Sequence, residues 1–296
     1  MSYVKDLDIR GIVAFALKED IGAKDITTEM LIPRNKFVKA ILIAKEDCLV
    51  CGLSLASLVF KLQDKNIKFK PLISEGKLVK KGRVIARIQG RAKSILPAER
   101  VALNFLSFLS GIATKTRRFI EETKPYKVNP ALSATKRRRI VRKGGVKIMD
   151  TRKTIPGLRL LEKYAVRIGG GFNHRLSLDE MILVKDNHLK IIKGYQGLFR
   201  FSRGCRVELE VKNLREFKRA LQLKPDIIML DNMSLKDIKQ AVRIKNSLPH
   251  PIPKLEASGG ITLRNVKRVA STGVDMISIG DLTHSVDSVD ISLEIL

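Results

Sequence analysis

Apolar and polar residues follow two different patterns along the chain. From about residue 146 onward, short apolar runs alternate with segments in which apolar residues recur at helical spacing. The apolar runs, each as long as a strand, are residues 146–150, 181–185, 207–211, 226–231, 254–258 and 275–280. The helical segments are residues 157–166, 213–223, 234–245 and 262–272. The alternation predicts parallel strands with helical crossovers. So many units in a short stretch, without a Gly-rich dinucleotide fingerprint, favour a (β/α) barrel over a doubly wound sheet.

The first part of the chain predicts an α+β module instead. Helical spacing appears in residues 11–22 and 54–63. A third helix is expected to open at Pro97, because proline is tolerated in a first turn. Strand-like runs occupy residues 37–52, 67–74 and 83–90. Residues 75–90 alternate around glycines, which favours a tight hairpin.

Length and composition are typical of a folded protein without a membrane anchor. The chain has 296 residues, of which 44% are apolar, enough for one large domain or two ordinary ones. No run of about 18 apolar residues is present, so no membrane span is expected. The N-terminal "MSYVKDLDIR" carries charges where a signal peptide needs an apolar stretch. We therefore expect a cytoplasmic protein.

The chain is strongly basic. Lys and Arg number 57 against 30 Asp and Glu, which gives a formal net charge of +27. Such an excess fits a nucleic-acid partner, strongly anionic small substrates, or a proteome that is basic throughout. Aromatic residues make up only 5% and Trp is absent, whereas RNA-binding proteins stack bases on aromatic rings. Nucleic-acid binding is therefore the less favoured alternative.

The three cysteines do not make a zinc site by themselves. Cys48 and Cys51 form one C-x-x-C pair and Cys205 stands alone, whereas a tetrahedral zinc site needs four ligands. Reduced thiols in or near a strand are the favoured interpretation, and a redox or metal-binding pair is the alternative.

Polar residues stand at the ends of the predicted strands of the barrel. The carboxyl ends of barrel strands meet at one mouth, where active sites lie. Glu208 and Glu210 share one face of their strand because strand side chains alternate. We therefore expect a single cavity, lined by Arg152, Lys153, Lys185, Glu210, Asp231 and Ser258.

These residue types suit a ligand with several negative groups. Arg152 and Arg175 can each hold a carboxylate or phosphate through two hydrogen bonds, while Lys153 and Lys185 act as point charges. Three glycines, residues 169–171, precede Arg175 and favour a loop that belongs to the site.

The acidic residues and the glycine-containing loops suit the binding of a metal ion and of a phosphate group. Glu210 and Asp231 offer hard oxygen ligands that suit Mg²⁺ carried on a pyrophosphate. The loops "ASGG" and "SIGD" lack bulky side chains, so backbone N–H groups can approach a phosphate. No nucleophile with a basic partner stands out, which favours electrostatic over covalent catalysis. Together, these residues predict a site for a sugar phosphate, a magnesium-bound pyrophosphate and a second reactant that carries carboxylate groups.

Eight stretches resemble those of the quinolinate phosphoribosyltransferases, also called nicotinate-nucleotide pyrophosphorylases (carboxylating), and they occur in family order. They are "ALKEDIGAKDITTEMLIP", "PAERVALNFLSFLSGIATKTRRF", "DTRKTIPGLRLLEKYAVRIGGGFNHR", "KDNHL", "VELEV", "IIMLDNMS", "EASGGIT" and "SIGDLTHSVDSVDISLEI". Any single stretch is a weak signal, but together they cover most of the chain and are very specific.

The resemblance implies a reaction, a fold and an assembly. Quinolinate and phosphoribosyl pyrophosphate would give nicotinate mononucleotide, pyrophosphate and CO₂ in de novo NAD biosynthesis, with Mg²⁺ as cofactor. An N-terminal α/β sandwich domain, residues 1–113, would precede a partly open (β/α) TIM-like barrel, residues 114–284. Residues 285–296 would pack back on the first domain. The family works as a homodimer or hexamer.

The resemblance also implies roles for individual residues. The substrate dicarboxylate would meet Arg152, His174 and Arg175, together with Arg100 from the neighbouring subunit, and Thr151 would also bind substrate. Lys153 and Lys185 would lie among the substrate carboxylates and phosphates. Glu210 and Asp231 would hold the ribose hydroxyls and magnesium, and would act in catalysis with Lys153. The 5′-phosphate would be bound by Ser258, Gly259, Gly260, Gly280 and His284.

One departure from the family pattern and two alternatives stay open. The connection of residues 120–145, which carries "KRRR" and "RKGG", is longer than is usual in the family. It is interpreted as a solvated basic loop, or alternatively as a lid or interface arm. A related pyrophosphorylase of the molybdate-transport paralogue type is one alternative function, and a basic nucleic-acid-binding barrel protein is the other.

Overall fold

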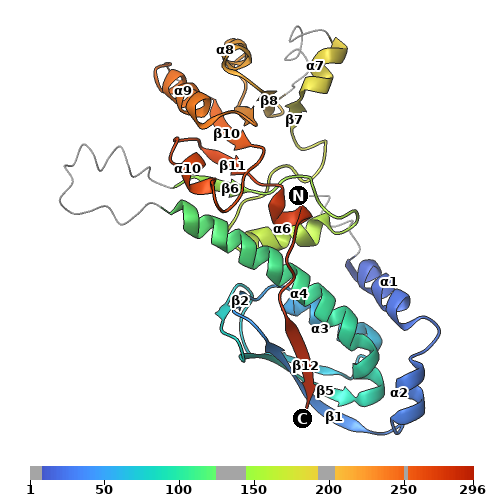
Figure 1. The fold of residues 1–296 in the computed structure, drawn as a ribbon. Coiled ribbons are helices and arrows are strands. Elements are labelled where there is room, and N and C mark those ends of the chain that lie inside the picture. Colours follow the sequence, from blue (N-terminus) through green and yellow to red (C-terminus); the bar gives the residue numbers. More distant parts are fainter. Residues whose placement is uncertain (1–8, 125–144, 193–203, 250–252) are drawn as a thin grey trace, which may run out of the picture. The chain divides into compact units, whose positions relative to one another are not determined.

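The computed structural model describes residues 9–124, 145–192, 204–249 and 253–296 (Figure 1). The chain divides into two compact units, which are described separately below. Unit 1 comprises residues 1–117, 155–170 and 285–296, and unit 2 comprises residues 118–154 and 171–284. The basic connection of residues 120–145 lies almost wholly outside the described residues, so neither interpretation of it is tested.

Unit 1 is built on an antiparallel sheet of four strands. They are β1 (Phe37–Ala44), β3 (Lys68–Pro71), β5 (Val84–Arg91) and β12 (Ile291–Ile295), in the order β12-β1-β5-β3. Alternate residues of β1, namely Ala40, Leu42 and Ala44, are buried, as expected for a sheet with one face in the core. The C-terminal strand thereby becomes part of the same sheet as the first strand.

The helices of unit 1 are α1 (Ile9–Ile21), α2 (Ile26–Leu31), α3 (Leu53–Gln63), α4 (Ala92–Thr123), whose last residues belong to unit 2, and α6 (Arg159–Ile168). Helix α3 packs against β3, and α1 packs against α3. The prediction that Pro97 opens the third helix was wrong, because α4 begins at Ala92. Pro97 is the sixth residue of the helix, so it lacks the N–H that would donate to the carbonyl of Lys93, and its ring crowds that carbonyl.

Helix α4 is long and apolar enough to cross a membrane by length and composition alone, although polar residues interrupt it and it contains no run of 18 apolar residues. In the structure, 56% of its most apolar window is buried inside the protein. Leu106, Leu109 and Ile112 are fully or almost fully buried. This burial is typical of the core helix of a folded domain.

The predicted hairpin of residues 75–90 was also wrong. Strand β4 (Leu78–Val79) pairs with β2 (Cys48–Leu49) in a separate two-stranded sheet. Strand β5 cannot accept β4 as a partner because β1 and β3 occupy both of its edges. The glycine-containing turn therefore carries the chain from one sheet to another.

The paired cysteines of this region are free thiols. Cys48 and Cys51 are both buried, whereas Cys205, in unit 2, is exposed. Burial raises the pKa of Cys48 to about 11 and raises that of Cys51 still further. Since metal binding and disulfide exchange need the thiolate, this environment favours the interpretation as reduced structural thiols.

Unit 2 is built on six parallel strands. They are β6 (Lys147–Met149), β7 (Ile182–Val184), β8 (Val207–Val211), β9 (Ile227–Asp231), β10 (Lys254–Ser258) and β11 (Met276–Ser278), in the order β6-β11-β10-β9-β8-β7. All six lie where the apolar runs predict them. Strands β6 and β7 stand at the two edges, and Phe172 makes a parallel bridge to Met149 on the free side of β6. The prediction of a partly open (β/α) barrel is confirmed.

Helices follow the strands of unit 2. They are α7 (Asp186–Ile192), α8 (Leu214–Gln222), α9 (Leu235–Asn246), α10 (Val266–Ala270) and α11 (Asp281–His284). Asn213 and Ser234 cap α8 and α9 by accepting hydrogen bonds from backbone N–H groups of the first turn. Helix α8 packs against β8, β9 and α9. Met181, Ile227 and Met276, with Met149 packed against them, form one apolar cluster of this unit.

The domain limits differ from those predicted, 1–113 and 114–284. The division falls within α4, after Arg117, and α6 clusters with unit 1 although it follows β6 in the chain. The reason is close packing at the end of α6. A Cβ at Gly169 would lie 2.6 Å from Thr116 Cβ and 2.7 Å from the carbonyl oxygen of Ala113 on α4. Residues 285–296 belong to unit 1, where β12 pairs with β1.

The contact between α4 and the C-terminal segment gives a stability prediction. A Cβ at Gly111 would overlap the backbone oxygen of Asp287. Gly111→Ala gains about 1 kcal/mol of helix propensity but costs about 3 kcal/mol through the forced backbone shift. We expect a net loss of about 2 kcal/mol in the free energy of unfolding, measured by urea denaturation followed by circular dichroism.

The matched control is Asn104→Ala, at an exposed position of the same helix, which should change stability by less than about 0.5 kcal/mol. A Gly111→Ala protein as stable as the wild type would contradict the packing described here.

Candidate active site

A cavity of about 620 Å³ lies at the carboxyl ends of the six parallel strands of unit 2. The predicted residues that line it are Thr151, Arg152, Lys153, His174, Arg175, Lys185, Glu210, Asp231, Ser258, Gly259, Gly260, Gly280 and His284. The prediction that strand-end residues face one cavity is therefore confirmed. Arg100 does not line the cavity; it is an exposed residue of α4 in unit 1.

Sheet register explains why residues far apart in sequence meet here. Asp231 on β9 is paired with Ser258 on β10, and Glu210 on β8 is paired with Met229 one layer below Asp231. Because strand side chains alternate, Glu208 and Glu210 point to the same side of the sheet. Parallel pairing thus places successive strand-end side chains around one mouth.

Two arginines give the cavity its strongest positive charge. The Nε of Arg152 is buried and has no hydrogen-bond partner among the described residues. Burial lowers the pKa of the Arg175 guanidinium, the charge of Arg152 lowers it further, and Glu208 opposes the shift. Arg175 Nη1 donates to the carbonyl oxygen of Met181 at 2.8 Å, which fixes its side chain. Two neighbouring half-buried cations, one with an unused buried donor, make a site for an anion.

Acidic groups lie on the β8 and β9 side of the cavity. Lys185 Nζ is 3.9 Å from Glu210 Oε2. Burial raises the pKa of Glu210; the charges of Asp231 and Asp186 add to this, while Lys185 and Lys212 oppose it. Glu210 and Asp231 stand on the adjacent strands β8 and β9 and both line the cavity, an arrangement that a cation or a developing positive charge stabilises.

Glycines at two positions keep the cavity open because a side chain would collide with site residues. At Gly259, where φ is +89°, a Cβ would overlap the Asn232 side-chain amide. At Gly280 a Cβ would lie 2.9 Å from Lys153 Cδ and 3.0 Å from His284 Cδ2. Loops without bulky side chains allow backbone N–H groups to approach a phosphate, and Gly259, Gly260 and Gly280 all line the cavity.

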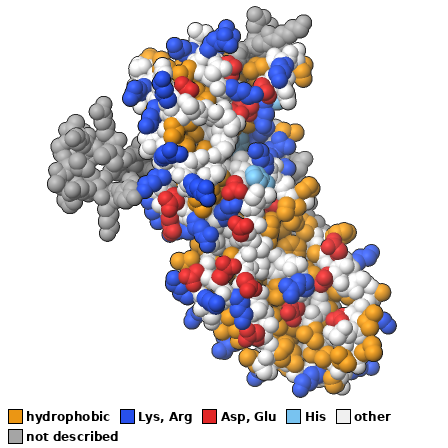
Figure 2. All heavy atoms as spheres, viewed as in Figure 1, with side chains coloured by type: hydrophobic (Ala, Val, Ile, Leu, Met, Phe, Trp, Pro, Cys, Tyr) orange, Lys and Arg blue, Asp and Glu red, His pale blue; other side chains and the backbone are white. Residues whose placement is uncertain are grey.

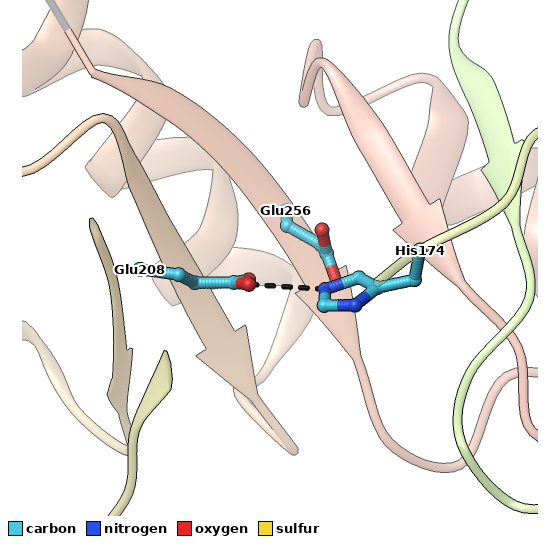
Figure 3. Close-up of side chains that lie close together, drawn as sticks. All are labelled: His174, Glu208 and Glu256. Carbon is cyan, nitrogen blue, oxygen red and sulfur yellow. Dashed lines mark hydrogen bonds and ion pairs between the residues drawn. The ribbon is translucent and has the colours of Figure 1, made fainter. Parts of the chain in front are cut away.

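His174 is held by groups behind the cavity (Figure 3). Its Nδ1 accepts a hydrogen bond from the backbone N–H of Arg175 at 2.9 Å, so the ring proton is on Nε2. Nε2 lies 3.0 Å from Glu208 Oε2 and 3.7 Å from Glu256 Oε1. The buried carboxylate of Asp150 accepts from the backbone N–H of His174 at 2.8 Å and from Asn173 Nδ2 at 2.5 Å. The loop that carries His174 and Arg175 is therefore fixed from both sides.

Three residues of this arrangement were not among the predicted site residues. Glu208 was recognised as sharing a face with Glu210 but was given no role, and Glu256 and Ser278 were assigned only to strands. Glu256 lines the cavity, and its Oε1 accepts a hydrogen bond from Ser278 Oγ at 2.5 Å. The signal that could have revealed both acids is a Glu in the middle of an apolar strand, in "VELEV" and "KLEAS".

Comparison with known protein families identifies both parts of the chain. The family domain described as quinolinate phosphoribosyl transferase, N-terminal domain, matches residues 25–110. The domain described as quinolinate phosphoribosyl transferase, C-terminal domain, matches residues 112–294. The chain belongs to the quinolinate phosphoribosyltransferase family. The resemblance seen in the sequence is thereby confirmed.

Individual members of the quinolinate phosphoribosyltransferase family match over nearly the full length. The chain is 39% identical to a probable nicotinate-nucleotide pyrophosphorylase [carboxylating] of Methanocaldococcus jannaschii, over 99% of both chains. It is 38% identical to the Synechocystis protein of the same name, over 95% of this chain and 90% of that one.

Solved structures of the family show the same fold. The nicotinate-nucleotide pyrophosphorylase from Francisella tularensis matches with a TM-score of 0.85 and 38% identity, over 97% of this chain and 96% of that one. The enzyme of the same name from Ehrlichia chaffeensis gives 0.86 and 36%, over 98% and 100%. The pairing of a sandwich-like sheet domain with a partly open barrel is thus a property of the family.

The hydrogen bonds of Asp150 give a prediction for the site loop. Asp150→Ala leaves the His174 backbone N–H without this acceptor, which should cost about 1–3 kcal/mol of stability and speed hydrogen exchange at the His174 amide. Asp150→Asn retains one side-chain oxygen as an acceptor and should cause a smaller increase in the exchange rate. Exchange at His174 that is unchanged in Asp150→Ala would show that this carboxylate does not hold the loop.

Proposed function

We propose that this protein transfers the phosphoribosyl group of phosphoribosyl pyrophosphate to quinolinate and releases pyrophosphate and CO₂, giving nicotinate mononucleotide for de novo NAD biosynthesis. Membership in the quinolinate phosphoribosyltransferase family supports the reaction. The observation that carries the assignment is the cavity itself. It brings two half-buried arginines, two lysines, two neighbouring carboxylates and two glycine loops to one strand-end mouth.

The acceptor end of the cavity suits a dicarboxylate. Arg152, with its buried and unused Nε, and the adjacent Arg175 would each bind a carboxylate, because the guanidinium group matches two carboxylate oxygens. His174 and Thr151 line the same cavity and would complete the binding pocket for the acceptor. Quinolinate carries two carboxylates on adjacent ring carbons, so two separate cations are needed to neutralise it.

The donor end suits a phosphate ester. Ser258 would supply a hydroxyl and His284 a ring, and Gly259, Gly260 and Gly280 bring side-chain-free backbone to the cavity wall. We assign the 5′-phosphate to these five residues because short, side-chain-free loops after late barrel strands are a recurrent phosphate site of this architecture.

The reacting carbon would lie between the acids and the lysines. As pyrophosphate leaves, the ribosyl C1′ becomes positively charged, and the carboxylates of Glu210 and Asp231 stabilise that charge. Lys153 and Lys185 take up the negative charge that develops on the departing pyrophosphate. Both groups are fixed at strand ends before the reaction begins, so little reorganisation is needed.

Loss of CO₂ follows from the chemistry of the product ring. Ribosylation makes the pyridine nitrogen positive, and the C–C bond to the adjacent carboxylate can then break, with its electron pair held next to that nitrogen. A proton replaces CO₂ at this carbon. The protein's contribution is to keep the ring oriented by its remaining carboxylate and to exclude water.

We also propose Mg²⁺ as the cofactor. Glu210 and Asp231 fit this ion, because they present hard carboxylate oxygens on the adjacent strands β8 and β9 where both line the cavity. When bound through the pyrophosphate, Mg²⁺ neutralises charge on the leaving group.

One assay tests the proposed function. Purified protein with quinolinate, phosphoribosyl pyrophosphate and Mg²⁺ should release CO₂ and nicotinate mononucleotide in equal amounts, and nicotinate in place of quinolinate should not support pyrophosphate release. Turnover only with another aromatic acid would instead indicate an enzyme of the molybdate-transport paralogue type. Tight binding in a gel-shift assay at physiological salt, without turnover, would indicate the nucleic-acid-binding alternative.

Arg152 provides the sharpest test of the acceptor end. Arg152→Ala should lower kcat/KM for quinolinate at least about a hundredfold, the size expected when about 3 kcal/mol of charge-assisted contact is lost in a dry site. Arg243→Ala, which removes an exposed arginine from α9, should leave kcat/KM unchanged. Near-native turnover of Arg152→Ala would exclude this residue from the site.

We propose that the active form is at least a homodimer, or a hexamer of such dimers. Unit 1 exposes large apolar side chains along α1, α2 and the start of β1, and hydrophobic side chains gather over these elements (Figure 2). They are Phe15, Ile26, Met30, Leu31 and Phe37. An exposed cluster of this kind supports a subunit interface. The exposed Arg100 would then reach the cavity of the partner subunit.

Subunit mixing tests the shared site. Arg100→Ala and Arg152→Ala should each be inactive, whereas a mixture under conditions of subunit exchange should recover part of the activity, because a hybrid dimer contains one intact site. The rescue should be absent when either variant is mixed with itself. No rescue despite proven exchange would show that Arg100 acts within its own chain or not at all.

We further propose a cytoplasmic location. A rice relative, of which the chain covers 78%, is named chloroplastic, so an organelle is the alternative location. Cell fractionation followed by immunoblotting tests this, and recovery with membranes would contradict it.

A further inference from the structure

Two carboxylates are buried side by side behind the cavity. Glu208 on β8 and Glu256 on β10 are both fully inaccessible to solvent, and the Nε2 of His174 faces both carboxylates (Figure 3). One ligand atom from each of the three side chains lies within 4.8 Å of the others. Two like charges this close, on side chains that are fully buried, are strongly unfavourable unless a cation compensates them or one of them is protonated.

The positive groups nearby compensate only one of the two acids. Glu208 Oε2 receives the His174 Nε2–H at 3.0 Å, and the neighbouring Arg175 attracts Glu208 as well. Glu256 lies farther from the same nitrogen, at 3.7 Å, and its hydrogen-bond donor is the neutral hydroxyl of Ser278. Because His174 Nδ1 already accepts the Arg175 N–H, the ring does not bind a second proton without losing that contact.

Among the described residues, the strands paired with β10 place no cation beside Glu256, although Arg152, Lys153, Arg175 and Lys185 line the same cavity. Its register partners on β9 and β11 are Met229 and Met276, which do not titrate. On β10 itself, Lys254 is exposed and Ser258 is neutral. Burial and the charge of Glu208 raise the pKa of Glu256 to about 8, whereas His174 and Ser278 oppose the shift.

We propose that Glu256 is a positioning residue that holds one proton at the wall of the cavity, so that the pair does not present two negative charges, while the Glu208 side chain fixes His174 through its Nε2–H. The stored proton keeps a second negative charge away from the place where the substrate carboxylates bind. The inference rests on the proposed function in taking the acceptor to be a dicarboxylate. A metal ion held by the same three side chains is the competing explanation of their geometry.

The expected pH dependence follows from the direction of the shift. Below about pH 8 Glu256 is protonated and neutral, and as the pH rises through this range it becomes a carboxylate that repels the acceptor. The KM for quinolinate should therefore rise at least about tenfold between pH 7 and pH 9.5 in the wild type, since each pH unit above the pKa lowers the protonated fraction about tenfold. Changes in kcat should be smaller, because Glu256 acts through binding and orientation.

Glu256→Gln is the decisive variant, since it has the same shape and is permanently neutral. It should retain kcat/KM within about threefold of the wild type at pH 7, and its KM should stay flat up to pH 9.5. Glu19→Gln, at an exposed position of α1, should keep the wild-type pH profile. A loss of more than tenfold at pH 7 in Glu256→Gln, or an unchanged alkaline rise in KM, would overturn the inference.

Infrared spectroscopy of the ligand-free protein tests the stored proton without any substrate. At pH 7 the wild type should show the C=O band of a buried protonated carboxyl group, which Glu256→Gln removes and Glu19→Gln retains. Absence of this band, or retention of one equivalent of metal after chelation, would overturn the inference even in a fully active enzyme. If the band behaves as expected but quinolinate is not turned over, the stored proton stands and the proposed function falls.

Discussion

Parallel pairing of six strands is the constraint on which the site depends. It fixes the carboxyl end of every strand at one edge, so side chains separated by more than a hundred residues in the sequence share one cavity. The result is electrostatically costly in the absence of a ligand, because Arg152 and Arg175 repel each other and Arg152 has an unused buried donor. A dianionic ligand would offset the repulsion between the two arginines. Relief of this repulsion would therefore favour ligand binding.

The surrounding structure holds these charges in place. Asp150 anchors the loop of His174 and Arg175, and Gly259 and Gly280 keep side chains out of the space that a phosphate would fill. Behind them, Glu208 and Glu256 orient His174 from the interior. Each of these contacts is local, and each holds a group that lines the cavity. The position of the cavity-lining groups therefore depends on the residues packed around them.

Much of the fold could be predicted from hydrophobic periodicity, and the failures have physical reasons. Apolar runs bounded by polar ends marked all six barrel strands, because a strand buried on both faces leaves a continuous apolar signal. Periodicity does not name partners, however. It could not tell that α6 packs against α4 through Gly169, or that β4 pairs with β2 instead of β5. Periodicity also placed the start of α4 at Pro97 instead of Ala92. The sequence alone does not show whether a proline near the start of a helix lies in the first turn or just after it.

The site was predictable where polar residues interrupt a strand end and was missed where they lie inside a strand. Arg152, Lys185 and Asp231 follow apolar runs and were found on that basis, whereas Glu256 stands in the middle of one and was read as part of a core strand. Roles for single residues came from the family resemblance, and for Arg100 the single chain offers no test.

A crystal structure with quinolinate and a phosphoribosyl pyrophosphate analogue that cannot release pyrophosphate tests the central claim directly. Both ligands should occupy the one cavity of unit 2, with the quinolinate carboxylates on Arg152 and Arg175 and the 5′-phosphate at Gly259 and Gly260. Ligands bound elsewhere, or a cavity that stays empty at saturating concentrations of both, would contradict this account.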